Sequence, residues 1–117
     1  MTKKDIAHAF SMGNFTITYD FLQEDIQWNI VGDKFLNGKA AVIDFCDKTA
    51  AYFTQVKTIF TLNNSIAEDN CIAINGTAQF ITKENSITNM ASCDVYVFKE
   101  GKLKEITSYC INTNNNY

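Results

Sequence analysis

One short segment carries most of the side chains that could do chemistry. A strand over Met90 to Phe98 would place alternate residues on opposite faces, with Met90, Ser92, Asp94, Tyr96 and Phe98 on one of them. A carboxyl group beside two aromatic side chains is costly to ionise, so a pocket on this face would raise the pKa of Asp94. Asp94 is therefore the candidate catalytic residue, and the other four are candidate ligand contacts. The alternatives are a structural, hydrogen-bonded Asp94 or a reversed register that turns it to water.

Two further side chains combine an apolar body with a hydrogen-bonding tip. Trp28 and Tyr19 are candidate ligand-binding residues for this reason, although core packing alone would also explain both. The strand around Trp28 leaves its register open, since either Trp28 or Asn29 could face the pocket.

Several kinds of chemistry lack support. The single His and the scattered Cys46, Cys71, Cys93 and Cys110 include no C-x-x-C pair, so we expect no metal site and interpret the thiols as small buried apolar groups. No phosphate loop, nucleophile elbow or dinucleotide motif is present, and we expect no cofactor. All ten basic residues are lysines and the pI is about 5.0, which disfavours nucleic acid.

Length and hydropathy predict one cytoplasmic domain. The 117 residues suffice for a single core, and we assign residues 1–117 to one domain with 112–117 as a flexible tail. No signal-peptide pattern and no run of about 18 apolar residues occurs, so we expect no membrane association and reduced thiols.

The order of the predicted elements separates helices from strands. Helical spacing predicts a first helix that ends at Gly13, a second from Asn14 to Leu22 and a third over Val42–Phe53, with a strand over Glu24–Gly32 between the last two. From about Val56 the spacing changes to period 2, which indicates three or four strands joined by polar turns. This order predicts an α+β fold in which a curved antiparallel sheet wraps the helices.

Three stretches resemble one known superfamily in order and spacing. They are the helix end Ala9–Asn14, the acidic, Trp-containing strand Glu24–Gly32 with Leu36–Lys39, and the strand Asp94–Phe98 with Gly101–Leu103. Together they resemble the SnoaL-like and ketosteroid isomerase-like branch of the nuclear transport factor 2-like superfamily. The resemblance implies a cone-shaped, cystatin-like α+β barrel with a pocket for a small, largely apolar molecule.

The resemblance also assigns roles to individual positions. In ketosteroid isomerases the residue that matches Asp94 stays neutral and donates a hydrogen bond to an oxyanion. Their tyrosine is replaced here by Ile6, and their catalytic base by Asn29 or Ile30, so the standard isomerisation is disfavoured.

The same resemblance extends to the last strand and leaves a base unassigned. A hairpin register like the family's would turn Ile106 and Ser108 toward the pocket as ligand contacts. Asp33, Asp20 and His8 are the remaining candidates for a base, but we expect His8 to face solvent and Asp33 to be a solvated turn residue.

The face opposite Asp94 bears on assembly. Ala91, Cys93, Val95 and Val97, with Tyr109 and Ile111 beside them, make it more apolar than a water-facing sheet. Something should therefore cover this face. Members of the family that the chain resembles commonly pair through this sheet, so the resemblance implies a homodimer through the outer sheet face.

Three functions fit this pattern. The first is isomerase-, cyclase- or hydrolase-like turnover of a small apolar molecule through Asp94. The alternatives are binding of such a molecule without catalysis, and a protein-interaction or dimerisation module. Fold alone does not choose among them, so whether the chain is an enzyme stays open at this stage.

Overall fold

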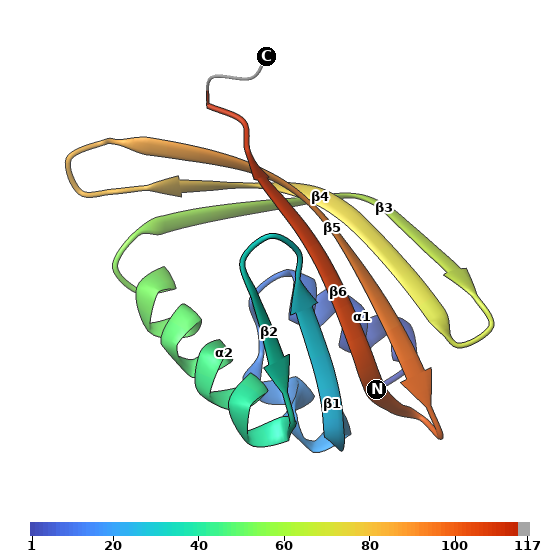
Figure 1. Cartoon of the computed structure of the whole chain (residues 1–117). Coiled ribbons are helices and arrows are strands. Elements are labelled where there is room, and N and C mark those ends of the chain that lie inside the picture. The colour runs from blue at the N-terminus through green and yellow to red at the C-terminus, as the bar shows by residue number, and fades with distance from the viewer. Residues whose placement is uncertain (115–117) are drawn as a thin grey trace.

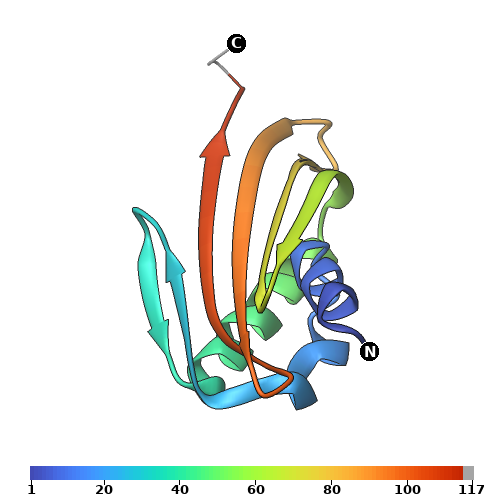
Figure 2. The same ribbon diagram turned by 90° about the vertical axis from the view of Figure 1, so that its right-hand side faces the viewer.

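The computed structural model describes residues 1–114, which form a six-stranded sheet with the helices on its concave side (Figures 1 and 2). In chain order the elements are α1 (Lys3–Ser11), the 3₁₀ helix η1 (Thr16–Phe21), β1 (Leu22–Ile30), β2 (Lys34–Asn37), α2 (Lys39–Phe53), β3 (Lys57–Glu68), β4 (Cys71–Ile81), β5 (Ile87–Lys99) and β6 (Lys102–Asn112).

The sheet has the strand order β2-β1-β6-β5-β4-β3. All neighbouring strands are antiparallel except β1 and β6, which run parallel with Trp28 opposite Ile106. The predicted α+β class is confirmed, but the sheet is mixed rather than wholly antiparallel. A parallel pair needs a long crossover, and here the chain from β2 to β5 supplies it. The sheet also ends in free edges at β2 and β3, so it is curved without closing into a barrel.

Local signals set both ends of α1. The Thr2 hydroxyl accepts a hydrogen bond from the Asp5 amide, and the Asp5 carboxylate accepts one from the Thr2 amide, which together form a capping box. The turn after the helix uses Gly13 at φ 78°. A side chain there would lie 2.7 Å from the Phe53 ring, so glycine allows the turn after α1 to pack against the last residue of α2.

The second predicted helix is shorter and tighter than the spacing indicated. Expected from Asn14 to Leu22, it is a 3₁₀ helix over Thr16–Phe21, and Leu22 already belongs to β1. The Thr18 hydroxyl donates to the Phe15 carbonyl at 2.6 Å, a local bond that competes with α-helical pairing.

A short strand was missed between β1 and α2. Lys34–Asn37 pairs with β1, with Leu36 opposite Trp28, where the sequence indicated only a loop. Four residues are too few for an alternating pattern to stand out.

The predicted meander of strands after α2 is confirmed as β3 to β6. The β4–β5 turn places Asn85 at φ 62° and the β5–β6 turn places Gly101 at φ 79°, both within predicted turns.

The expected flexible tail does not begin at residue 112. Asn112 is the last residue of β6, the Thr113 amide donates to the Asn89 carbonyl at 2.8 Å, and the Asn114 side chain donates to the Ile87 carbonyl at 2.8 Å. These bonds extend the contact with β5 by two residues. Residues 115–117 of the predicted tail lie outside the described part of the chain.

Burial follows the predicted alternation. Trp28 is buried while its neighbour Asn29 is exposed, which settles the register of β1, and Tyr96 and Phe98 are buried on the inner face of β5. At one end of the sheet this face is filled by side chains that pair across strands, and we call this cluster the packed end: Leu22, Ile72, Phe98 and Leu103.

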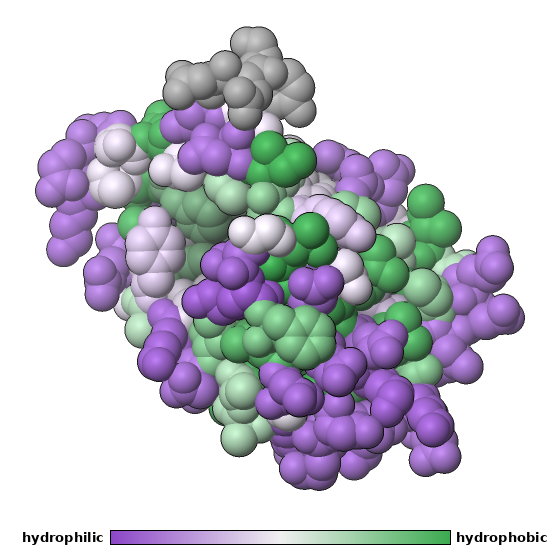
Figure 3. Space-filling view, viewed as in Figure 1, coloured by the Kyte–Doolittle hydropathy of each residue, from purple (hydrophilic) through white to green (hydrophobic). Residues whose placement is uncertain are grey.

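The outer sheet face carries exposed apolar side chains. Figure 3 looks onto this face in the orientation of Figure 1 and shows hydrophobic side chains gathered among hydrophilic ones. The exposed members include Ile59, Ile66, Tyr109 and Ile111, and Ile111 is 59% exposed. Scattered apolar residues are normal on a surface, but several on one sheet face mark a surface that can be covered. Within residues 1–114, no helix is long and apolar enough to cross a membrane.

Candidate functional site

A cavity of about 280 Å³ lies at the end of the inner sheet face opposite the packed end. We call this region the pocket end. The sheet, α1 and α2 enclose it, and its wall is mostly aromatic, with rings from Phe10, Phe15, Trp28, Phe45, Phe53, Phe60 and Phe80. The rings hold one another in place, since Phe10 meets Trp28 edge-on at 5.0 Å and Phe53 stacks on Phe80 at 5.5 Å.

Asp94 lies on the wall of this cavity. Alternation along β5 turns Met90, Ser92 and Asp94 inward at the pocket end, where they line the cavity. On β6 the same alternation brings Ser108 directly opposite Asp94 in the antiparallel ladder. Both predictions, the pocket face of β5 and the register of β6, therefore hold at Asp94, which lies beside Ser108 on the cavity wall.

A first chain of hydroxyl groups reaches Asp94 from α1. The Ser11 hydroxyl donates to Asp94 Oδ2 at 2.9 Å and lies 2.5 Å from the Tyr96 hydroxyl. A serine hydroxyl has one hydrogen, so when Ser11 donates to the Asp94 carboxylate, Tyr96 must donate to Ser11. The order is then Tyr96 to Ser11 to Asp94.

A second chain reaches Asp94 from β1 and β6. The Trp28 indole N–H donates to the Ser108 hydroxyl at 2.9 Å. An indole nitrogen can only donate, so Ser108 accepts from it and keeps its own hydrogen for Asp94. The two chains approach the carboxylate from different elements, and both deliver donors to it.

Burial and hydrogen bonding act on Asp94 in opposite directions. Burial raises the pKa of the Asp94 carboxyl above its usual range, and hydrogen bonds from Ser108 and Ser11 offset part of that rise. Burial, followed by the nearby Asp94 charge, also raises the pKa of Tyr96 well above its ordinary value. Asp94 can therefore exchange a proton at a pH where Tyr96 stays neutral.

The structure brings five of the predicted site residues together on the cavity wall: Trp28, Met90, Ser92, Asp94 and Ser108. It does not bring the other four there. Tyr96, Phe98 and Ile106 are fully buried core residues that do not line the cavity, because the core reaches further along the inner face than the predicted pocket allowed. Of these, Tyr96 still acts on the site through Ser11.

Tyr19 is also placed away from the cavity. Its hydroxyl donates to Asp47 of α2 at 2.6 Å, and it is not one of the lining residues. Tyr19 was a candidate because of its hydrogen-bonding tip, and the structure gives that tip a partner on α2 instead.

Neither Asp20 nor His8 lines the cavity, which leaves Asp94 and Asp33 as its carboxyl groups. His8 is not the solvent-facing residue expected, since it is half-buried and its Nε2 has no hydrogen-bond partner among the described residues. Ile6 lies in the core, and Asn29 is exposed on the far face of β1. No second base therefore occupies the positions of the missing family residues.

Sequence reasoning missed Ser11 and most of the aromatic wall. Ser11 follows the buried Ala7 by four residues, so helical spacing places it on the buried face of α1, and a polar residue there was the available signal. Phe60 and Phe80 come from different strands, so only the tertiary fold shows that they meet. The thiols differ from expectation in one respect, because Cys46 is buried as predicted but Cys110 is exposed.

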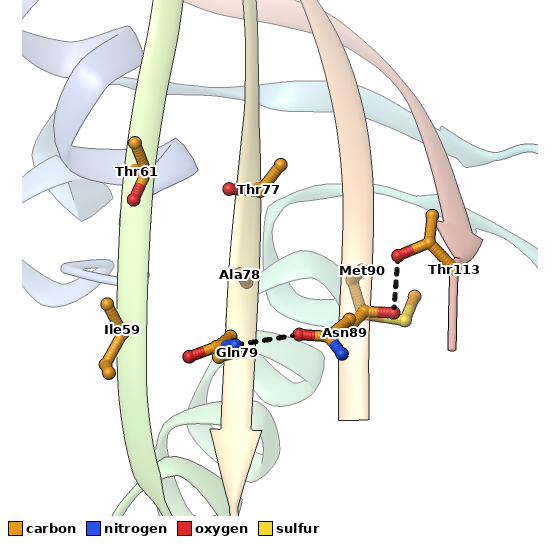
Figure 4. A pocket seen from close by; sticks show the side chains of 8 residues that line it. All are labelled: Ile59, Thr61, Thr77, Ala78, Gln79, Asn89, Met90 and Thr113. Atoms are coloured by element: carbon orange, nitrogen blue, oxygen red, sulfur yellow. Dashed lines mark hydrogen bonds between the residues drawn. The ribbon is translucent and has the colours of Figure 1, made fainter. Parts of the chain in front are cut away.

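A second depression, of about 320 Å³, lies on the other side of the sheet (Figure 4). It is slightly larger than the cavity, but none of its lining residues is ionisable. Its polar groups bond to one another, since Gln79 donates to Asn89 at 3.0 Å and Thr113 donates to the Asn89 carbonyl (Figure 4). The inner cavity is therefore the better candidate for chemistry. Among residues 1–114, no group of three or more His, Cys, Asp or Glu side chains is arranged to hold a metal ion.

Comparison with known proteins supports this architecture. No protein-family model matches the chain, and no curated protein matches it. Among solved structures, an NTF2-like protein of unknown function from Cytophaga hutchinsonii is 37% identical, with a TM-score of 0.84 over 92% of this chain and 94% of that one.

More distant structures share the fold alone. An LEH-like epoxide hydrolase from M. tuberculosis is 15% identical, with a TM-score of 0.72 over 93% of this chain and 82% of that one. A putative SnoaL-like polyketide cyclase from Jannaschia is 8% identical, with a TM-score of 0.73 over 92% of this chain and 84% of that one. The resemblance inferred from the three sequence stretches is thus confirmed, and the chain belongs to the nuclear transport factor 2-like (NTF2-like) family.

Proposed function

We propose that this chain binds a small, largely apolar molecule in the pocket-end cavity and transfers a proton to or from it through Asp94. The reaction class is isomerase-, cyclase- or hydrolase-like, in which one carboxyl group acts as base and then as acid. One observation carries the proposal. Asp94 is a carboxyl group on an aromatic cavity wall, and it accepts hydrogen bonds from the hydroxyl groups of Ser11 on α1 and Ser108 on β6.

The environment of Asp94 suits a general base. An efficient base has a pKa near the working pH, and burial moves the pKa of Asp94 upward from its ordinary value. With both hydroxyl chains donating to it, the carboxylate is held in one orientation toward the cavity. This arrangement favours proton abstraction over the neutral-donor role implied by the family resemblance, because the protein already supplies the donors.

Exchange of carbon-bound protons tests this proposal without knowledge of the natural substrate. The probe is phenylacetone in D₂O, followed by NMR. Asp94 would remove an α-proton to leave an enolate, and deuterium would return from solvent through the same carboxyl group. We expect the protein to exchange these protons roughly 10²-fold faster than Asp94→Asn does, which is the lower range for general-base catalysis.

Asp20→Asn is the matched control, because it makes the same chemical change at an exposed carboxylate outside the cavity. The exchange rate of this control should equal that of the unmodified protein. Equal rates for the unmodified protein and a folded Asp94→Asn variant would refute turnover through Asp94. If phenylacetone still bound in that case, non-catalytic binding would be the function.

The outer sheet face supports a second function in assembly. We propose that a second copy of the chain covers the apolar residues there, which include Ile111 and Tyr109. Light scattering at micromolar concentration should give the mass of a dimer, and Ile111→Lys should shift it toward the monomer. A monomer for the unmodified protein would contradict this assembly and leave the cavity proposal untouched.

A further inference from the structure

The charged groups at the cavity are all of one sign. Among the residues that line it, Asp33 and Asp94 carry the carboxyl groups, and no lysine or histidine is among them. A cavity with acidic groups and no cation has a negative potential that its low-dielectric walls strengthen. Such a potential favours a cation over an anion.

Asp33 is an exposed residue that lines the cavity. It lies in the turn between β1 and β2, where its amide donates to the Ile30 carbonyl at 2.9 Å. Its carboxylate makes no hydrogen bond or ion pair with any residue in 1–114. The carboxylate is thus available to a bound molecule.

The two carboxylates act on a common region of the cavity. Burial raises the pKa of the Cys110 thiol, and the charges of Asp94 and then Asp33 raise it further. Cys110 also lines the cavity, so its wall receives the field of both acids.

Asp94 has no cationic partner in the described chain. The ion pairs of residues 1–114 join Lys39 to Glu24, Lys48 to Asp44 and Lys104 to Asp25, all away from the cavity. The contacts of Asp94 are neutral hydroxyl groups, which stabilise a carboxylate without neutralising it. A partly buried carboxylate without a counterion is a natural partner for a cation supplied by a ligand.

The aromatic wall suits the same chemistry. Ring faces attract ammonium groups, and the seven rings of the wall surround the cavity. The structure contains one such contact already, because the Lys34 ammonium lies 4.9 Å from the centroid of Phe45, one of the wall rings. Lys34 is exposed and is not one of the residues that line the cavity.

We propose that the cavity selects a cationic ligand, a small molecule with an apolar or aromatic body and a protonated amine, whose ammonium group is bound between Asp33 and Asp94. This inference rests on the proposed function and names its substrate class. The volume of about 280 Å³ limits the body to a single ring or a short chain. Asp33 is then the specificity-determining residue, and Asp94 is both counterion and proton acceptor.

Three probes of similar shape and different charge test the proposal. They are phenethylammonium, 2-phenylethanol and 3-phenylpropanoate, titrated at neutral pH and low salt. The indole N–H signal of Trp28 reports occupancy in a proton–nitrogen NMR spectrum, because it is the only tryptophan and it lines the cavity. We expect Kd to be at least about tenfold lower for the ammonium than for the alcohol, and no measurable binding of the carboxylate.

Single-residue variants assign the preference to the two acids. Asp33→Asn should weaken ammonium binding by roughly two- to fivefold, the range of an exposed charge pair, and leave alcohol binding unchanged. Asp94→Asn should remove most of the remaining preference. The matched control Asp20→Asn should bind all three probes as the unmodified protein does.

Two results would overturn the inference. One is an alcohol or carboxylate probe that binds as tightly as the ammonium probe, and the other is an unchanged preference in the folded Asp33→Asn and Asp94→Asn variants. In both cases Asp94 can still catalyse proton exchange of phenylacetone, so these results would not refute the proposed function. Conversely, if Asp94→Asn exchanged phenylacetone protons as fast as the unmodified protein while the ammonium probe still bound best, catalysis would be rejected and the cationic ligand class retained.

Discussion

The two ends of the inner sheet face are built from the same strands and serve different purposes. At the packed end, Phe98 of β5 and Leu103 of β6 lie opposite each other, at 2% and 0% exposure. At the pocket end, the side chains of Met90 and Ser92 on β5 face a cavity instead of packing against a core. One end thus holds the fold together, and the other leaves room for a ligand.

The polar groups show the same division. The hydrogen-bonded set of Ser11, Tyr96, Asp94, Ser108 and Trp28 lies where the core gives way to the cavity. Tyr96 and Ser108 are buried at 0% and 2% exposure, so the core fixes them, while Asp94 is only partly buried. A packed core that anchors a polar group at the edge of a hollow is a means of preorganising chemistry.

The largest expected effect is on stability at the packed end. Leu103→Ala should lower the free energy of unfolding by about 2–5 kcal/mol, because it removes a fully buried side chain and leaves a void. Met90→Ala, at the half-buried cavity wall, should cost less than about 1.5 kcal/mol. Urea unfolding measures both, and similar losses at the two positions would remove the distinction between the ends.

A smaller effect is expected where the two ends meet. Ser108→Ala should cost about 1–3 kcal/mol, because the buried Trp28 indole N–H loses its acceptor. It should also raise the pKa of Asp94 further, since Ser108 is one of the groups that lower it. Ser92→Ala is the control, because Ser92 lines the cavity without a part in either hydroxyl chain. If Ser108→Ala were as mild as Ser92→Ala, the second chain would have no energetic role.

The smallest expected effect is on the pH dependence of the unfolding free energy, to which Asp94 at the pocket end contributes. The folded-state pKa of Asp94 is raised, so its protonated form is the one favoured by folding, and the stability it contributes is present below the unfolded value of about 3.9. That contribution is lost as the pH rises from there through the folded-state pKa. Tyr96 and Cys110, whose pKa values are raised by burial and by Asp94, stay neutral across this window.

Asp94→Asn should therefore flatten the pH dependence of the unfolding free energy above about pH 4. Urea unfolding at several pH values measures this, with Asp20→Asn as the control that keeps the original slope. Parallel curves for the unmodified protein and Asp94→Asn would show that burial does not oppose ionisation of this carboxyl group.

Sequence patterns predicted the parts of the fold that depend on local spacing. Alternation placed Asp94 inward, Gly13 ended the first helix, and the order of elements indicated the family. The inward position of Ser108 came from the family resemblance. The patterns failed at η1, where a Thr18 side-chain bond favours 3₁₀ geometry, and at β2, which is too short to show a period.

The boundary of the pocket could not be predicted in the same way. Tyr96 and Phe98 share the face of Asp94, and only the packing of α1 and the neighbouring strands decides that the core ends between Tyr96 and Asp94. Likewise, the aromatic wall joins rings from helices and from three strands, whose meeting depends on tertiary contacts. The candidate residue was visible in the sequence, and the shape of its surroundings was not.

A ¹³C NMR titration of the Asp94 carboxyl carbon, assigned by its loss in Asp94→Asn, measures whether this group can act as the proton acceptor of the cavity. We expect the pKa of Asp94 to lie clearly above the ordinary aspartate value of about 3.9. In Ser11→Ala the pKa of Asp94 should be higher still, because the variant removes a hydrogen bond that lowers this pKa. A pKa at or below about 3.9, unchanged in Ser11→Ala, would contradict both the burial of this carboxyl group and its role as the proton acceptor of the cavity.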